Sequence, residues 1–380
     1  LLSVVRNERP ERPTLFEFFL NDPLYELLVG TPMPADPGIN GRSSGTREEA
    51  LAQYRKLGRW FADAFAAAGY DYVTLPPHVV FPGYQYRKAA HATAASHSLN
   101  EQPLVTSWDE LERFPWPDPA MIDPAILEAL TSHFPEGMRA LITTPDGVLE
   151  ILIDLIGYDN LCFMLVDARE LVAAIAGRIG ESLLPLYRVT VEHPKVGALI
   201  SSDDWGFKTQ TMISPADLRE FIFPAHREMV NIAHASGKPI LLDSCGQLTE
   251  VMDDVIDDLG FDAKHSYEDV IEPVEEIYER LGDRIAVLGG IDLGFHCKAS
   301  RDEITHRSRA MLERSRGRGG YALGSGNSIP DCVTHDAYFA MTRAALEGQE
   351  VRRNPTRCSI SYRDPTWNAY HHPRAYTPIS

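Results

Sequence analysis

The chain has 380 residues, of which 44% are hydrophobic and 24% are charged, as is typical of a soluble globular protein with one large core. Its formal net charge of -18 argues against nucleic acid and anionic membrane surfaces as partners, because both attract basic surfaces. No stretch approaches the roughly 18 consecutive apolar residues of a membrane span, so we expect no membrane partner either.

The cysteines and the first residues of the chain indicate a reducing compartment. The first residues lack the basic and then apolar pattern of a signal peptide, and no two cysteines are spaced as Cys-x-x-Cys. We therefore expect a cytoplasmic protein with free thiols and no structural zinc knuckle. The five cysteines are Cys162, Cys245, Cys297, Cys332 and Cys358.

Short apolar strands alternate with longer helical patterns from about residue 70 onward. A capping box from Thr46 to Glu49 opens the helix that precedes the first strand. Most strands are dense in Val, Ile and Leu without strict alternation, which is typical of parallel strands covered on both faces. The seven predicted strands are 70–76, 140–145, 196–203, 238–245, 261–267, 284–292 and 319–326.

The later helices also have readable ends. Ser214 and Pro215 open a helix that runs to 236 and stops before Pro239, and Ser300 to Glu303 match a second capping box. The Pro-rich and aromatic stretch 80–135 reads as irregular loops and surface helices that form a lid. We expect one domain over residues 1–350 and a C-terminal arm over 351–380.

These elements predict an α/β fold, specifically a (β/α)8 TIM barrel with an N-terminal extension of helix and loop. No Gly-rich dinucleotide fingerprint follows the first strand, which disfavours the open doubly wound sheet. Polar residues recur directly after nearly every strand, as expected when all strands end at one common face. The eighth strand is not placed by the sequence.

The polar residues that follow the strands are the candidates for a functional site. Because the strand ends of a barrel converge on one cavity, these side chains are expected to share it. The candidates, in chain order, are His78, Asp203, Asp204, Trp205, Asp243, Cys245, His265, Asp292 and Asn327.

Asp243 and Cys245 form an Asp-x-Cys element at the end of the fourth strand. Side chains at i and i+2 share one face of a strand, and both carboxylate and thiolate bind zinc. The alternative is that Asp243 caps the following turn and Cys245 is a small buried residue. Spacing alone favours the alternative, because two ligands do not make a metal site.

Asp203 and Asp204 end the strongly apolar third strand. One of them is expected to face the cavity and to orient the substrate, bind a cationic nitrogen or transfer protons. The other is then a loop cap or a solvated residue, and a pair of either with Lys208 would be structural. His265 ends the fifth strand as a potential metal ligand or acid–base group, and the adjacent Lys264 points to the opposite face.

Five segments resemble the uroporphyrinogen decarboxylase-like superfamily, which includes corrinoid-dependent methyltransferases. The similarity covers about residues 45 to 350 and is strongest beyond 200, and it implies a (β/α)8 barrel with an open cleft. The segments are Ile213 to Pro215 with the helix that follows, Pro239 to Gly246, Ala263 to Asp269, Leu288 to Asp292 and Tyr321 to Pro330.

The resemblance does not extend to the residues of the decarboxylases themselves. Their arginine-rich RQAGRY motif has no match here, the segment after the first strand reads Leu75 to His78 without the expected Asp, and Asn327 stands where a His is expected. The methyltransferase branch binds zinc through His-x-Cys and a later Cys, and zinc there activates a thiol. In this sequence Cys245 matches, Asp243 replaces the His, and the later cysteine is missing unless the loop brings Cys332 back.

From this resemblance we expect a methyltransferase or demethylase that works with a corrinoid protein or a thiol acceptor. Zinc bound by Asp243, Cys245 and His265, or no metal at all, are both left open. The resemblance and the tail together favour a homodimer. The alternatives are a metal-independent decarboxylase of an aromatic or tetrapyrrole-like carboxylate, and a tetrapyrrole- or corrinoid-binding barrel without catalysis.

The residues are assigned as follows. Catalysis is expected from Asp203, Asp204 and His265, and substrate binding from a second group. That group is His78, Trp205, Asp292 and Asn327.

Overall fold

The computed structural model describes residues 1–37, 45–86 and 103–347, which form one compact unit. The predicted arm 351–380 lies outside the described residues. None of the described helices is long and apolar enough to cross a bilayer.

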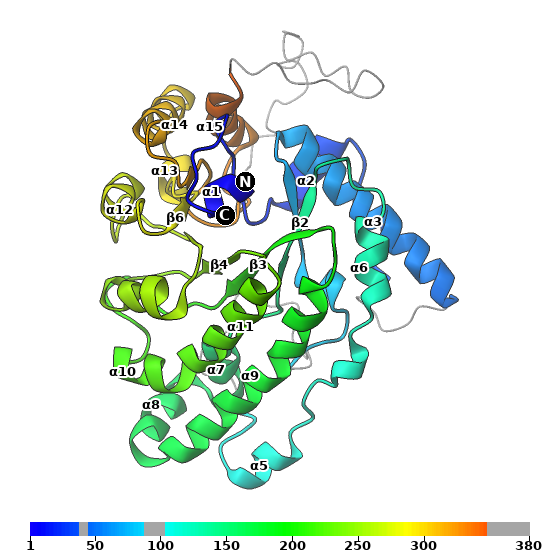
Figure 1. Ribbon diagram of the computed structural model, residues 1–380, viewed down its shortest axis with the longest axis vertical. Coiled ribbons are helices and arrows are strands. Elements are labelled where there is room, and N and C mark those ends of the chain that lie inside the picture. The colour runs from blue at the N-terminus through cyan, green and yellow to red at the C-terminus, as the bar shows by residue number, and fades with distance from the viewer. Residues whose placement is uncertain (38–44, 87–102, 348–380) are drawn as a thin grey trace, which may run out of the picture. The chain divides into compact units, whose positions relative to one another are not determined.

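Seven parallel strands form one sheet in chain order, β1 to β7 (Figure 1). Each predicted strand is confirmed, but each is shorter because its polar end curves into a turn. Only β3 exceeds five residues. The strands are β1 (Tyr72–Leu75), β2 (Arg139–Thr143), β3 (Val196–Ser202), β4 (Ile240–Asp243), β5 (Ala263–His265), β6 (Ala286–Leu288) and β7 (Tyr321–Ala322).

The predicted eight-stranded barrel is met only in part, because the described residues contain no eighth strand. In its place the extended residues 14–17 lie between β7 and β1. The backbone of Leu323 accepts from Phe16 N and donates to Thr14 O, both at 2.8 Å. On the other side the Tyr72 hydroxyl of β1 accepts from Glu17 N at 2.6 Å and donates to Glu17 O at 2.7 Å. Two backbone bonds and one side chain thus span the gap, too few for a strand.

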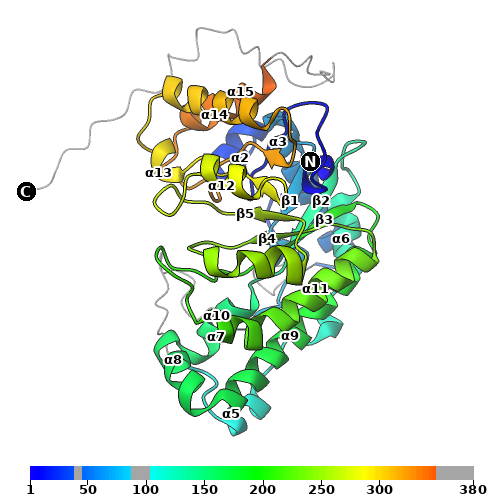
Figure 2. The same ribbon diagram turned by 60° about the vertical axis from the view of Figure 1, so that its left-hand side comes forward.

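Helices follow the strands and cover the sheet. The two long ones, α9 and α11, pack against each other beside β3 (Figures 1 and 2). The α-helices are α1 (Leu2–Val5), α2 (Asp22–Val29), α3 (Arg47–Ala68), α4 (Pro77–Val80), α5 (Trp108–Arg113), α6 (Pro124–Thr131), α7 (Val148–Ile156), α8 (Tyr158–Asp167), α9 (Arg169–Val191), α10 (Pro215–Asp217), α11 (Phe223–Ala235), α12 (Val274–Leu281), α13 (Leu293–His296), α14 (Arg301–Ser315) and α15 (His335–Leu346). Short 3-10 or π segments are η1 (Pro119–Met121), η2 (Leu218–Ile222), η3 (Thr249–Val251) and η4 (Asp254–Leu259).

The predicted helix starts are confirmed. Thr46 and Ser300 make capping boxes, and the Ser214 hydroxyl accepts from Asp217 N at 3.1 Å. The helix after Ser214 is interrupted by the wide turn η2, because Pro224 has no N–H to continue the regular ladder. The described part of 80–135 consists of short helices and loops, as predicted.

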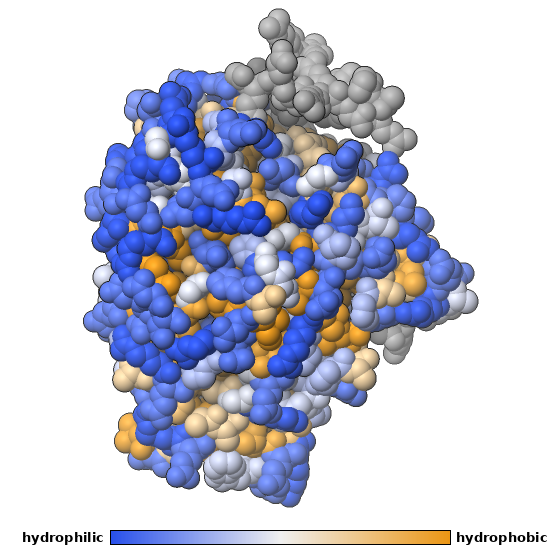
Figure 3. Space-filling model, in the orientation of Figure 1, coloured by the Kyte–Doolittle hydropathy of each residue, from blue (hydrophilic) through white to orange (hydrophobic). Residues whose placement is uncertain are grey.

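The surface seen in Figure 3 is largely hydrophilic, with apolar residues gathered at its lower left end, where α8 lies. Two large side chains of α8 are mostly exposed there, Phe163 at 70% and Val166 at 78%. The core lies around the sheet, where the strands are buried along nearly their whole length.

Candidate active site

The carboxyl ends of β4 and β5 bring Asp243 and His265 together. His265 Nδ1 lies 2.7 Å from Asp243 Oδ1, and both side chains are largely buried. The His265 ring packs edge-on against Phe16 at 4.9 Å, and its Nε2 is 3.4 Å from the Ser325 carbonyl oxygen. Asp243 therefore fixes the orientation of the ring, as a carboxylate does for a catalytic or ligating histidine.

Cys245 lies next to this pair and contacts residues from three strand ends. Its Sγ is 3.2 Å from Ser266 Oγ and 3.2 Å from Asn327 Nδ2, while its backbone N–H donates to Asp204 Oδ1 at 2.7 Å. Burial and then the charge of Asp204 raise the pKa of the Cys245 thiol. At neutral pH this residue is therefore a thiol rather than a thiolate.

The loops that carry these side chains approach each other closely. Gly246 has a φ of 88°, and a Cβ there would lie 2.1 Å from the carbonyl oxygen of Gly206, so only glycine fits after Cys245. Ser266 has a φ of 76°, which L residues rarely adopt, and this turn aims its hydroxyl at Cys245.

Asp204 and Glu150 form an acidic pair beside the thiol. Burial raises the pKa of Asp204. Burial, followed by the charges of Asp203 and Asp204, raises the pKa of Glu150 to about 9. Two carboxyl groups in one partly buried place do not both ionise readily, so the pair keeps a proton at neutral pH.

Asp203 points the other way and is fully buried. Its oxygens accept from the Leu149 and Glu150 N–H groups at the start of α7, at 3.1 Å, and lie 2.8 Å from His226 Nε2. The Ser201 hydroxyl occupies the other ring nitrogen of His226 at 2.9 Å. Asp203 is thus a helix cap and half of an internal ion pair, and its predicted catalytic role is not part of this cluster.

Glu17 supports the site from the segment between β7 and β1. It is fully buried and accepts from the Ser325 N–H at 2.8 Å and from the Ser325 hydroxyl. Burial raises the pKa of Glu17 to about 8, although the bonds from Ser325 lower it. The same Ser325 hydroxyl also contacts the Asn327 carbonyl, so Glu17 holds the turn that presents Asn327.

Lys264 lies on the opposite face of β5 from His265, as predicted. Its Nζ donates to the carbonyl oxygens of Ser244, His265 and Ser266 at 3.0, 3.2 and 2.7 Å, and lies 4.3 Å from the Tyr267 ring centroid. Burial lowers the pKa of Lys264 to about 8. The ammonium group therefore clamps the backbone on both sides of Cys245 and Ser266.

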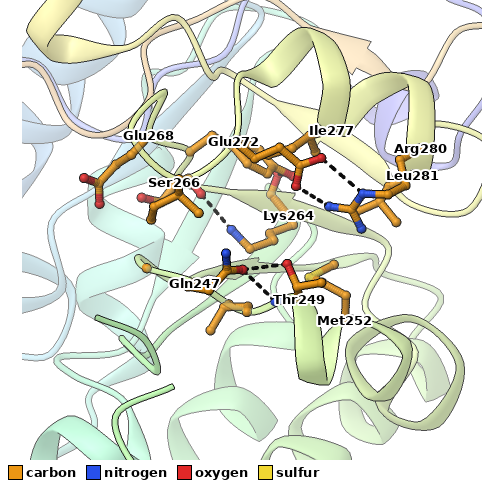
Figure 4. Close-up of a pocket in the computed structure, with 14 residues that line it drawn as sticks. Gln247, Thr249, Met252, Lys264, Ser266, Glu268, Glu272, Ile277, Arg280 and Leu281 are labelled. Carbon is orange, nitrogen blue, oxygen red and sulfur yellow. Dashed lines mark hydrogen bonds and ion pairs between the residues drawn. The ribbon is translucent and has the colours of Figure 1, made fainter. Parts of the chain in front are cut away.

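A cavity of about 40 Å³ opens beside Lys264, between η3 and α12 (Figure 4). Gln247 and Thr249 line it on one side, and the ion-paired Glu272 and Arg280 on the other. This volume holds only a few water molecules, so the cavity is not the substrate pocket.

Three predicted substrate-binding residues do not join the cluster. His78 is exposed on α4, and Trp205 is fully buried against Phe223 and His226. Asp292 caps α13 through Phe295 N at 2.8 Å and accepts from Asp269 N at 3.1 Å. Their binding roles stay predictions, whereas Asn327 lies within the cluster.

The predicted zinc ligands do not converge on one point. Within the described ranges, no group of three or more His, Cys, Asp or Glu side chains is arranged to hold a metal ion. Asp243 and His265 bond each other, and Cys332 lies 2.8 Å from Cys297 rather than near Cys245. Lys208 pairs with Glu268 at 3.8 Å, not with Asp203 or Asp204.

Comparisons with known proteins were made once this geometry was in hand. Residues 89–347 match the family model described as uroporphyrinogen decarboxylase (URO-D). Two curated proteins of that name are similar in sequence, one from Myxococcus xanthus, 27% identical over 193 residues (50% of this chain and 52% of that protein), and one from Sorangium cellulosum, 28% identical over 193 residues (48% and 52%). The chain spans about half the length of these relatives.

A solved structure described as a methyltransferase from Methanosarcina mazei has a similar fold. Its TM-score is 0.65, with 15% sequence identity over 91% of this chain and 97% of that one. At this identity the likeness concerns the fold alone.

Proposed function

The chain belongs to the uroporphyrinogen decarboxylase family, and from this premise we propose that it is a methyltransferase or demethylase that acts on a neutral or cationic methylated compound. The acceptor in this proposal is a corrinoid protein or a small thiol. Residues 14–17 serve as the eighth position of the barrel wall, and the reaction takes place at the strand ends in the cytoplasm.

The charge of the site carries the proposal. Its side chains include four carboxyl groups, and none of the hydrogen bonds or ion pairs that the described residues give them comes from an arginine. The one nearby buried cation, Lys264, spends its donors on backbone carbonyls. A polycarboxylate substrate would meet repulsion here, whereas a neutral or cationic one would not. The carboxyl groups are Glu17, Glu150, Asp204 and Asp243.

The acidic pair supplies the proton that such a reaction needs. When the bond between a methyl carbon and a substrate oxygen breaks, the electron pair stays on oxygen and the methyl group goes to the acceptor. Glu150 or Asp204, which hold a proton at neutral pH, protonate that oxygen. The acceptor supplies the nucleophile and departs methylated.

The other residues of the cluster bind and orient the substrate. His265, aligned by Asp243, and the amide of Asn327 offer hydrogen bonds beside the Cys245 thiol. Because the pKa of Cys245 is raised, this thiol lines the site and does not act as the nucleophile. No step here depends on zinc, since Asp243 and His265 bond each other.

The test uses the purified chain, methoxylated and methylamine donors, and free cob(I)alamin as acceptor, with methylcobalamin followed by absorbance. Asp204→Asn and Glu150→Gln are each expected to slow transfer from oxygen by about 100- to 1,000-fold. The exposed Asp258→Asn is the matched control and should leave the rate unchanged. Failure of every donor, or a full rate in both acid variants, would contradict the proposal, and so would loss of activity after chelation.

A second candidate is decarboxylation, which the names of the two curated relatives favour. Glu150 or Asp204 would then protonate the ring carbon as carbon dioxide leaves. Release of carbon dioxide from uroporphyrinogen by the same preparation, without methyl transfer, would support this candidate against the first.

A further inference from the structure

Two exposed cysteines lie side by side away from the acidic pair. Cys297 ends α13 and Cys332 lies in the loop before α15, with the two sulfur atoms 2.8 Å apart. They are 35 residues apart in the chain, so the fold, not the sequence, brings them together. Cys162 is also exposed but has no such thiol contact among the described residues.

We propose that Cys297 and Cys332 are an oxidisable dithiol that closes to a disulfide when the chain meets a peroxide or a small disulfide. The sulfur atoms need to approach by less than 1 Å to reach the bonded distance of about 2.05 Å. Solvent exposure gives the oxidant access, which the largely buried Cys245 lacks.

The reaction balances with hydrogen peroxide as the oxidant. The Cys332 sulfur attacks one peroxide oxygen, which gives a sulfenic acid and one water. The Cys297 sulfur then displaces the hydroxyl group from that sulfenic acid, which forms the S–S bond and a second water. Partial burial and the neighbouring thiol raise the pKa of Cys297 to about 11, so Cys297 keeps its proton and Cys332 reacts first.

The disulfide would restrain the loop that follows Asn327. That loop is attached at one end by Ile329 N, which donates to Phe19 O at 2.9 Å, and by Asn21 Nδ2, which donates to Pro330 O at 3.1 Å. A covalent tie at Cys332 adds a second anchor, to α13. Oxidation therefore stiffens the turn that presents Asn327 to Cys245.

The experiment oxidises the full chain, in a Cys358→Ser background, with hydrogen peroxide and maps its peptides by mass spectrometry. A single linked pair that joins the peptides of Cys297 and Cys332, and is released by dithiothreitol, is expected. Cys297→Ser and Cys332→Ser should each abolish it, whereas Cys162→Ser should not. In Cys297→Ser, dimedone should label Cys332.

Two further readings test the restraint. Oxidation should slow hydrogen exchange at the Ile329 and Val333 amides about tenfold and raise the unfolding midpoint by about 5 °C. A linked pair that involves Cys162 or Cys245, or full alkylation of Cys297 and Cys332 after oxidation, would overturn the proposal. Unchanged exchange in a linked chain would overturn the restraint. None of these readings depends on the proposed reaction.

Discussion

Two buried Asp–His pairs lie one strand apart in this protein, and they differ in what else they contact. Asp203 and His226 are 2.8 Å apart, and α7 amides and Ser201 occupy their other atoms. Asp243 and His265 are 2.7 Å apart, but their remaining contacts are long, 3.3 Å to Ser202 Oγ and 3.4 Å to the Ser325 carbonyl.

The difference separates structure from chemistry. A pair whose hydrogen-bonding capacity is filled by the protein holds elements together and has nothing left for a substrate. A pair with weakly engaged atoms beside a thiol and an acidic pair can accept a ligand at little cost. The sequence shows the same residue types in both places, so the surroundings decide.

The largest expected effect concerns stability. Asp203→Ala leaves His226 and two α7 amides without a partner and should lower the free energy of unfolding by about 4 kcal/mol. Asp243→Ala should cost only about half as much, because solvent reaches that pair more easily. Urea denaturation measures both. Equal losses would remove the distinction between the two pairs.

Glu17 sharpens the comparison through pH. The pKa of this carboxyl is raised from 4.5 to about 8, so between these values the unfolded chain has released a proton that the folded chain keeps. Stability should therefore fall as pH rises through this window, by on the order of 3 kcal/mol for this group. Glu17→Gln should remove that fall in denaturation curves from pH 5 to 8. The exposed Glu26→Gln should retain it.

Lys264 acts on the opposite side of β5, and its pH dependence has the opposite sign. With its pKa lowered from 10.5 to about 8, the folded chain loses a proton between these values that the unfolded chain keeps, so stability rises there. Lys264→Met should lack this rise and lose about 2 kcal/mol at pH 7, because three carbonyls lose their donor. Lys208→Met, exposed at the rim, should change stability by less than about 0.5 kcal/mol.

The smallest effect is expected at Ser266. Glycine adopts its φ of 76° without strain, so Ser266→Gly should change the free energy of unfolding by less than about 1 kcal/mol. Loss of the hydroxyl beside Cys245 should instead appear as faster alkylation of that thiol. Ser266→Ala should be the less stable of the two variants, and a more stable alanine variant would contradict this reading of the turn.

The sequence predicted the strands because runs of Val, Ile and Leu alternate with capped helices. It also predicted that Asp243, Cys245, His265 and Asn327 share one region, since parallel strands end on the same side. It left open which of Asp203 and Asp204 faces the site. Neighbouring strand residues point to opposite faces, but only the position of α7 decides which carboxylate caps it.

Other parts of the site had no local signal. Glu17 lies in a segment with two backbone bonds to Leu323, too short to show a strand pattern. Ser266 adopts a glycine-like φ that its residue type does not indicate. Glu150 looks like an ordinary acid in the first turn of a helix, and only burial beside Asp204 gives it a proton to donate.

The segment that fills the gap beside β1 also determines when the site can assemble. Ser325 and Glu17 are 308 positions apart, so a growing chain emerges from the ribosome with Glu17 long before its partner exists. Until then the buried carboxyl and the aromatic rings around it have no seat, and the contact is among the most sequence-distant in the protein. Synthesis is thus nearly finished before the first catalytic turnover is possible, and a nascent chain stalled before β7 would be inactive.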